Sequence, residues 1–135
     1  MIYGRAIRVE FNHCDPAGIV FFPRYYEMLN SVVENFFREV LEAPWERVTG
    51  EEGHGVPTVR LETEFRAPSR LGEVLDFGLQ VVAVGRSSVD FALEARCGGA
   101  LRLASRHRLV WVNREGRSAP WPDGMRARLA GQVGQ

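Results

Sequence analysis

The residues with the clearest chemical potential lie together in the segment HCDPAGIVFFPRYYE, residues 13–27. Asp15 precedes Pro16 there, and Gly18 follows shortly after. An Asp-Pro step is a common turn or helix-capping pair, so Asp15 could have a purely structural role. The apolar residues that follow would also partly desolvate its carboxylate, which suits a general base or nucleophile. The residues alone leave both roles open.

A helix predicted to begin at Pro23 supplies a second component of acyl-transfer chemistry. Proline suits the start of a helix because its missing N–H would have no partner there. The first backbone N–H groups of a helix are free, and the helix dipole is positive at that end. Such donors can polarise a carbonyl oxygen. A carboxylate beside an oxyanion donor is the minimum equipment for acyl transfer.

Other polar residues give weaker signals. His13 and Cys14 adjoin Asp15 directly, a spacing poorly suited to one metal ion, so no metal site is expected. His107 lies mid-strand among arginines and is expected at the surface or at an interface. The segment GRSS, residues 85–88, is either a hairpin turn with a solvated arginine or a cradle for the phosphates of a nucleotide-bearing substrate.

The elements that would position these residues follow from the spacing of apolar residues. From Pro23 they recur three and four apart as far as Leu41, which predicts an amphipathic helix of about five turns. A first strand is predicted before it, with Ile7, Val9 and Phe11 on one face. Alternation of apolar and polar residues predicts four later strands. The predicted strands cover 2–11, 56–65, 73–85, 87–97 and 100–113, and short helices cover 43–48 and 121–131.

Together these elements predict an α+β fold in which a curved antiparallel sheet wraps around the long helix. The last four strands are expected to follow one another as a meander. No shift in composition and no repeat divides the chain, so residues 1–135 are expected to form a single domain. The outer face or the edge of such a sheet would require a second subunit.

The composition excludes several classes of function. The 135 residues include 17 basic and 17 acidic side chains, which argues against nucleic acid or an anionic membrane as the main partner. Every basic residue is arginine, so Schiff-base chemistry on lysine is excluded. Two cysteines do not make a disulfide framework, and nothing reads as a signal peptide or membrane span, so a reduced cytoplasmic protein is expected.

The segment FNHCDPAGIVFFPRYYEMLNSVVENFF resembles the active-site segment of the 4-hydroxybenzoyl-CoA thioesterase family of hot-dog-fold proteins. The DPAGIV core, the aromatic pair, the proline and the amphipathic helix all match. The segments APWERV, GVPTVRLETEFRAPSRLGEVLDF and GRSSVDFAL continue the resemblance over roughly residues 5–113. It implies a hot-dog fold, with a five-stranded antiparallel sheet wrapped around one long helix.

The resemblance also implies an activity and a set of site residues. Such proteins hydrolyse acyl-CoA thioesters without a metal or redox cofactor, and CoA is part of the substrate. Asp15 would be the nucleophile or general base, and the backbone N–H of Phe22 would hold the thioester oxygen. Family members form homodimers with the site at the interface, usually paired into homotetramers. The residues implied to contact substrate are Gly18, Phe21, Tyr25, Tyr26, Arg86, Ser87 and Ser88.

The predicted function is therefore an acyl-CoA thioesterase, acting on an aromatic substrate such as hydroxybenzoyl-CoA or on a short or medium acyl group. Aromatic residues at the helix start suit a benzoyl-like group, although core packing would also explain them. Two alternatives stay open. A hydratase or dehydratase would need a second acid or base, for which His13 is the nearest candidate. A non-catalytic acyl-CoA binding protein would bind the same ligand without turnover.

Overall fold

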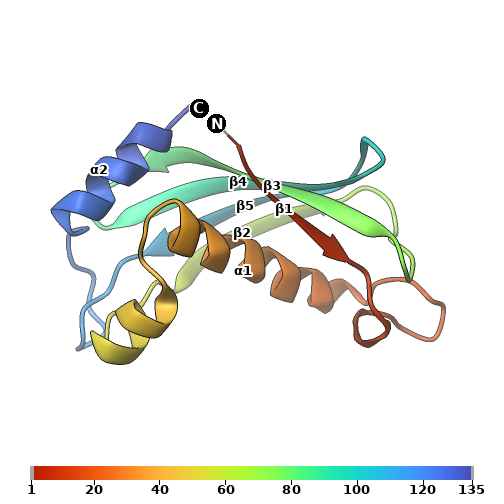
Figure 1. Ribbon diagram of the computed structural model, residues 1–135, viewed down its shortest axis with the longest axis horizontal. Coiled ribbons are helices and arrows are strands. Elements are labelled where there is room, and N and C mark those ends of the chain that lie inside the picture. The colour runs from red at the N-terminus through yellow and green to blue at the C-terminus, as the bar shows by residue number, and fades with distance from the viewer. Residues whose placement is uncertain (1, 135) are drawn as a thin grey trace.

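The structure, a computed structural model, describes residues 2–134 and consists of one curved sheet with a long helix along one face (Figure 1). Within these residues the strands form a five-stranded antiparallel sheet in the order β1-β3-β4-β5-β2. A shorter helix packs at one end of the sheet. The elements are β1 (Tyr3–Arg8), η1 (Phe11–His13), α1 (Phe22–Glu39), η2 (Glu46–Glu51), β2 (Thr58–Phe65), β3 (Val74–Val84), β4 (Ser88–Cys97), β5 (Ala100–Val110) and α2 (Asp123–Gln132).

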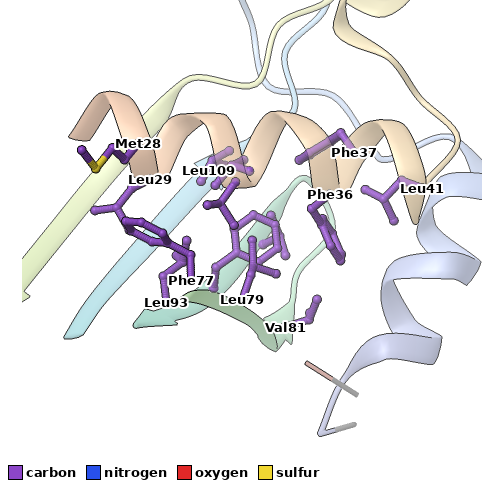
Figure 2. Close-up of a cluster of buried hydrophobic side chains, with 14 of the residues drawn as sticks. Met28, Leu29, Phe36, Phe37, Leu41, Phe77, Leu79, Val81, Leu93 and Leu109 are labelled. Carbon is purple, nitrogen blue, oxygen red and sulfur yellow. The ribbon is translucent and has the colours of Figure 1, made fainter. Parts of the chain in front are cut away.

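Helix α1 forms because its apolar residues share one face and because Pro23 lies in its first turn. Figure 2 shows this face against the sheet, with Leu29 and Phe36 of the helix directed towards Phe77 and Leu79 of β3. All four side chains are at most 2% exposed. The helical residues buried in this way are Tyr25, Met28, Leu29, Val32, Val33, Phe36 and Phe37. The predicted sheet-around-helix architecture is confirmed.

The first strand is shorter than predicted. It ends at Arg8, and Phe11 lies in the short helical turn η1 with 84% of its surface exposed. A capping box between Glu10 and His13 stabilises this turn, and the His13 Nδ1 accepts the Glu10 N–H at 2.8 Å. Local side-chain bonds therefore end a strand that the apolar alternation alone would continue.

The predicted four-strand meander is wrong in one connection. Strands β3, β4 and β5 do follow one another, but β2 pairs with β5 instead of β3. As a result β2 is an edge strand, and its apolar face is left open in the single chain. Val59, Leu61 and Phe65 are 57%, 43% and 45% exposed. We call these three residues the β2 stripe.

The short helices are close to their predicted places. The predicted helix over 43–48 is a π-helical turn shifted to Glu46–Glu51, and the terminal helix is confirmed as α2. Across residues 2–134, no helix combines the length and the apolar character needed to cross a membrane.

Candidate active site

Asp15 lies in a tight turn between η1 and α1, here called the aspartate turn, residues 15–20. The Asp15 N–H donates to the Ile19 carbonyl at 2.9 Å, and the Gly18 N–H donates to the Asp15 carbonyl at 3.0 Å. Gly18 adopts a φ of 78°, which glycine tolerates best. The Asp15 Oδ1 accepts the Ala17 N–H at 2.9 Å. The other carboxylate oxygen has no hydrogen-bond partner within residues 2–134, so Asp15 shapes its turn and keeps one oxygen available.

The start of α1 presents one free backbone donor. Phe21 is the N-cap in an extended conformation, and Phe22 is the first helical residue. Pro23 has no N–H, and the Arg24 N–H donates to the Phe21 carbonyl at 2.8 Å. The Phe22 N–H has no acceptor among the described residues, and it lies at the positive end of the helix dipole. The Phe21 N–H donates to the His13 carbonyl at 2.9 Å, which ties the helix start to the base of the aspartate turn.

Aromatic side chains gather around this helix start. Phe65, at the end of β2, lies with its ring centroid 6.2 Å from Phe22, 5.7 Å from Tyr25 and 6.4 Å from Tyr26. Phe21 packs on Phe22 at 5.9 Å. We call these five residues the aromatic cluster. Tyr25 is buried and belongs to the core, whereas Phe21, Phe22 and Phe65 are 50%, 57% and 45% exposed and form an open aromatic surface.

Phe65 was missed by the reasoning from sequence. The alternation of apolar and polar residues around Phe65 predicts a strand residue that faces the helix. Such a residue would ordinarily belong to the core. Only the pairing of β2 at the sheet edge leaves it half exposed beside the helix start. The one available signal was its aromatic type on the same strand face as Leu61.

A groove of about 510 Å³ continues from the aromatic cluster between α1 and the edge strand β2. Its walls combine apolar and polar side chains, so it can hold an aromatic group and also offer it hydrogen bonds. The lining residues are Tyr26, Glu27, Asn30, Thr58, Leu61 and His107.

His107 closes the sheet side of this groove and is buried, with 6% exposure. The predicted surface position is therefore wrong, and the other predicted position, at an interface, stays a prediction. Alternation along β5 directs His107 inwards, while Arg106 and Arg108 are exposed. Its Nε2 lies 2.9 Å from the Ser105 Oγ, which lies 2.8 Å from the Thr63 Oγ1. Burial lowers the pKa of His107 to about 4, so the ring is neutral at physiological pH.

The GRSS segment lies far from Asp15 within one chain. Strand β3 is 11 residues long and starts beside the loop that contacts the aspartate turn, so its other end is about 30 Å away. Figure 1 shows β3 spanning the sheet between these two ends. The backbone of the segment is used in packing: the Arg86 and Ser87 carbonyls accept N–H groups of Trp121 and Trp111 at 3.1 and 2.7 Å. The structure therefore does not bring Arg86, Ser87 and Ser88 to Asp15 of the same chain.

Comparison with known proteins defines the class. Residues 9–129 match the family model of the Thioesterase-like superfamily, and the chain belongs to this family. It is 38% identical over 69 residues to 4-hydroxybenzoyl-CoA thioesterase of Pseudomonas sp. (strain CBS-3). That match spans 50% of this chain and 49% of the relative, so it covers about half of each protein.

Solved structures confirm the hot-dog fold. A gentisyl-coenzyme A thioesterase aligns with a TM-score of 0.86 and 24% identity, over 93% of this chain and 98% of that one. A 1,4-dihydroxy-2-naphthoyl-CoA thioesterase from Synechocystis aligns with a TM-score of 0.87 and 17% identity, over 96% of each chain. At these identities the similarity establishes the shared fold.

Proposed function

We propose that this protein is an acyl-CoA thioesterase that hydrolyses an aromatic acyl-CoA to the free acid and CoA. The observation that carries the proposal is the free Phe22 N–H at the start of α1, tied by hydrogen bonds to the turn in which Asp15 keeps one free carboxylate oxygen. These two groups are the oxyanion donor and the base or nucleophile that acyl transfer requires.

The proposed reaction breaks the C–S bond of the thioester and forms a C–O bond. Asp15 either attacks the carbonyl carbon, giving an anhydride that water then cleaves, or removes a proton from the attacking water. The Phe22 N–H and the positive end of α1 stabilise the negative charge that develops on the carbonyl oxygen. The CoA sulfur leaves as a thiolate and takes up a proton. No metal or redox cofactor is part of this scheme.

An aromatic acyl group suits the surroundings of the helix start. The exposed faces of Phe21, Phe22 and Phe65 offer ring-to-ring contacts, and the adjoining groove carries the polar side chains of Asn30 and His107. The relative and the two solved structures compared above are each named for an aromatic acyl-CoA. We therefore propose an aromatic acid with polar ring substituents as the acyl component.

The proposed site is completed by a second copy of the chain. The exposed β2 stripe, on an edge strand, suits antiparallel pairing with the same strand of a partner. A twofold axis at this edge would make the partner's sheet run in the opposite direction. The partner's Arg86 would then lie at the end of the sheet where this chain presents Asp15. Ser87 and Ser88 of the partner subunit would accompany it against the CoA phosphates. Two such dimers would form the homotetramer.

For the alternative of a hydratase or dehydratase, the candidate second base, His13, is already engaged in a hydrogen bond among residues 2–134. His13 Nδ1 accepts the Glu10 N–H at 2.8 Å, so the neutral ring carries its proton on Nε2. That leaves no basic ring nitrogen free. The thioesterase remains the function that the arrangement supports best.

The test is a thiol-release assay on purified protein with benzoyl-, 4-hydroxybenzoyl-, phenylacetyl- and straight-chain CoA esters. Asp15→Asn is expected to lower kcat by about 100-fold or more, in line with the usual contribution of a catalytic base. Asp76→Asn, on the exposed outer side of β3, is the control and should retain activity. Unchanged hydrolysis in Asp15→Asn would overturn the assignment, and binding without turnover would favour a binding protein.

A further inference from the structure

The aspartate turn has one source of hydrogen-bonded support outside its own segment. Among the described residues, the turn bonds beyond residues 11–21 only to the loop between β2 and β3, residues 66–73. The Val20 N–H donates to the Ser69 carbonyl at 2.9 Å, and the Leu71 N–H donates to the Gly18 carbonyl at 3.1 Å. The position of the turn therefore depends on the position of this loop.

The loop is in turn held at residues 72 and 73 by Val9, whose N–H donates to the Glu73 carbonyl and whose carbonyl accepts the Gly72 N–H, both at 2.8 Å. The side chains and the middle of the loop are held by Arg102 of β5. The Arg102 Nη1 donates to the Pro68 carbonyl at 2.9 Å, to the Ser69 Oγ at 3.1 Å and to the Glu73 Oε1 at 2.9 Å. Its Nη2 donates to the Glu73 Oε2 at 3.1 Å. The Arg102 carbonyl also accepts the Arg66 N–H at 2.8 Å. One residue thus binds both ends and the middle of the loop.

The environment of this arginine differs from that of the other ion-paired arginines. The Arg102 side chain is 14% exposed, whereas every other arginine in a salt bridge within residues 2–134 is at least 43% exposed. Ser69, which it contacts, is fully buried. A two-pronged guanidinium–carboxylate pair in such a place imposes a defined geometry, unlike a solvated surface pair.

We propose that Arg102 is a positioning residue for Asp15: its contacts with Glu73 and Ser69 fix the 66–73 loop, and the loop fixes the aspartate turn. The inference rests on the proposed function, in which Asp15 performs the chemistry. Without the guanidinium, the loop can move away from Gly18 and Val20, and the carboxylate then occupies its productive orientation for less of the time. Small displacements of a reacting group lower the rate strongly.

Both partners of the Arg102–Glu73 ion pair stay charged under all assay conditions. The Arg102 guanidinium, with the Arg70 N–H at 2.7 Å, lowers the pKa of Glu73 to about 2. The effect of removing Arg102 should therefore be the same at pH 6 and pH 8, which separates a positioning role from a titrating one.

The test compares Arg102→Met with Arg108→Met. Arg108 lies on the same strand and makes a similar two-bond pair with Asp90, at 2.7 and 3.1 Å, but it does not touch the loop. Arg102→Met is expected to lower kcat about tenfold or more with KM changed less than about threefold. Amide hydrogen exchange at Val20 and Leu71 should accelerate about tenfold or more in Arg102→Met. The hydrogen bonds of these two N–H groups join the loop to the turn, so they break when the loop opens locally. Arg108→Met should change neither quantity.

Equal kcat and equal exchange rates in the two variants would overturn the proposal, as would a lowered melting temperature in Arg102→Met with unchanged kcat. If Arg102→Met does not fold, Glu73→Gln takes its place, because its side chain keeps one acceptor oxygen. It should lower kcat and accelerate exchange at Val20 and Leu71 in the same direction, but by smaller factors. If the unmodified protein hydrolyses no thioester, the proposed function fails. The exchange comparison at Val20 and Leu71 still tests the link between Arg102 and the turn.

Discussion

The buried His107 makes the stability of the protein depend on pH in a defined direction. In the folded chain burial lowers its pKa to about 4, from an ordinary value of 6.5. The unfolded chain therefore takes up the proton first as the pH falls. The stabilising contribution of the neutral ring is complete above pH 6.5 and is lost as the pH falls towards 4.

The size of the effect follows from the two pKa values. A difference of one unit corresponds to about 1.4 kcal/mol, so lowering the pH from 7 to 5 should cost about 2 kcal/mol of unfolding free energy through His107. Its hydrogen-bond partner Ser105 is uncharged, and so is Thr63, to which Ser105 is bonded in turn. Glu27, the one carboxylate that lines the same groove, is exposed to solvent and offsets little of this cost.

The measurement is urea unfolding at pH 7 and pH 5 for the unmodified protein and for His107→Gln. Glutamine can still hydrogen-bond to Ser105 but does not titrate, so groups common to both proteins cancel in the comparison. The unmodified protein is expected to lose about 2 kcal/mol more than the variant over this interval. Equal losses in the two proteins would refute the reasoning that a buried neutral histidine lines the groove.

Four further substitutions test the acyl surface, the proposed subunit edge and the core, the last of them as a surface control. Phe65→Ala should raise KM for 4-hydroxybenzoyl-CoA about tenfold in the thiol-release assay and affect straight-chain esters less, because ring-to-ring contacts are lost; an equal effect on both would contradict the aromatic surface. Leu61→Arg should convert the proposed dimer to a monomer in sedimentation experiments, and an unchanged mass would exclude the β2 edge as the interface. Phe36→Ala, at 1% exposure, should cost about 3–5 kcal/mol in urea unfolding. Phe11→Ala, at 84% exposure, should cost less than about 0.5 kcal/mol, and similar costs would contradict the observed burial.

Features that depend on neighbours in the sequence could be predicted well. The apolar spacing of α1, its start near Pro23 and the turn at Asp15 all arise from residues within a few positions of one another. The alternation of β3, β4 and β5 likewise shows which residues face the helix. The resemblance of residues 11–37 to a thioesterase active-site segment added the expected roles of these residues, which the residues alone could not rank.

Features that depend on distant parts of the chain could not be predicted in this way. Alternation is the same whether β2 pairs with β3 or with β5, so the sequence pattern did not reveal the open edge or the half-exposed Phe65. His107 was expected at the surface or at an interface because its sequence neighbours are charged, yet those neighbours face away from it and the ring is buried.

The sequence by itself therefore determined the helix, its amphipathic face and the carboxylate turn that precedes it, because each rests on contacts between near neighbours. Only the tertiary structure decided that Arg102 supports the aspartate turn through the 66–73 loop and that the GRSS segment lies at the opposite end of the sheet. These arrangements result from strand order and from burial of the whole core. Strand order and core burial depend on the relative free energies of all possible long-range strand pairings. No short segment of the sequence encodes them.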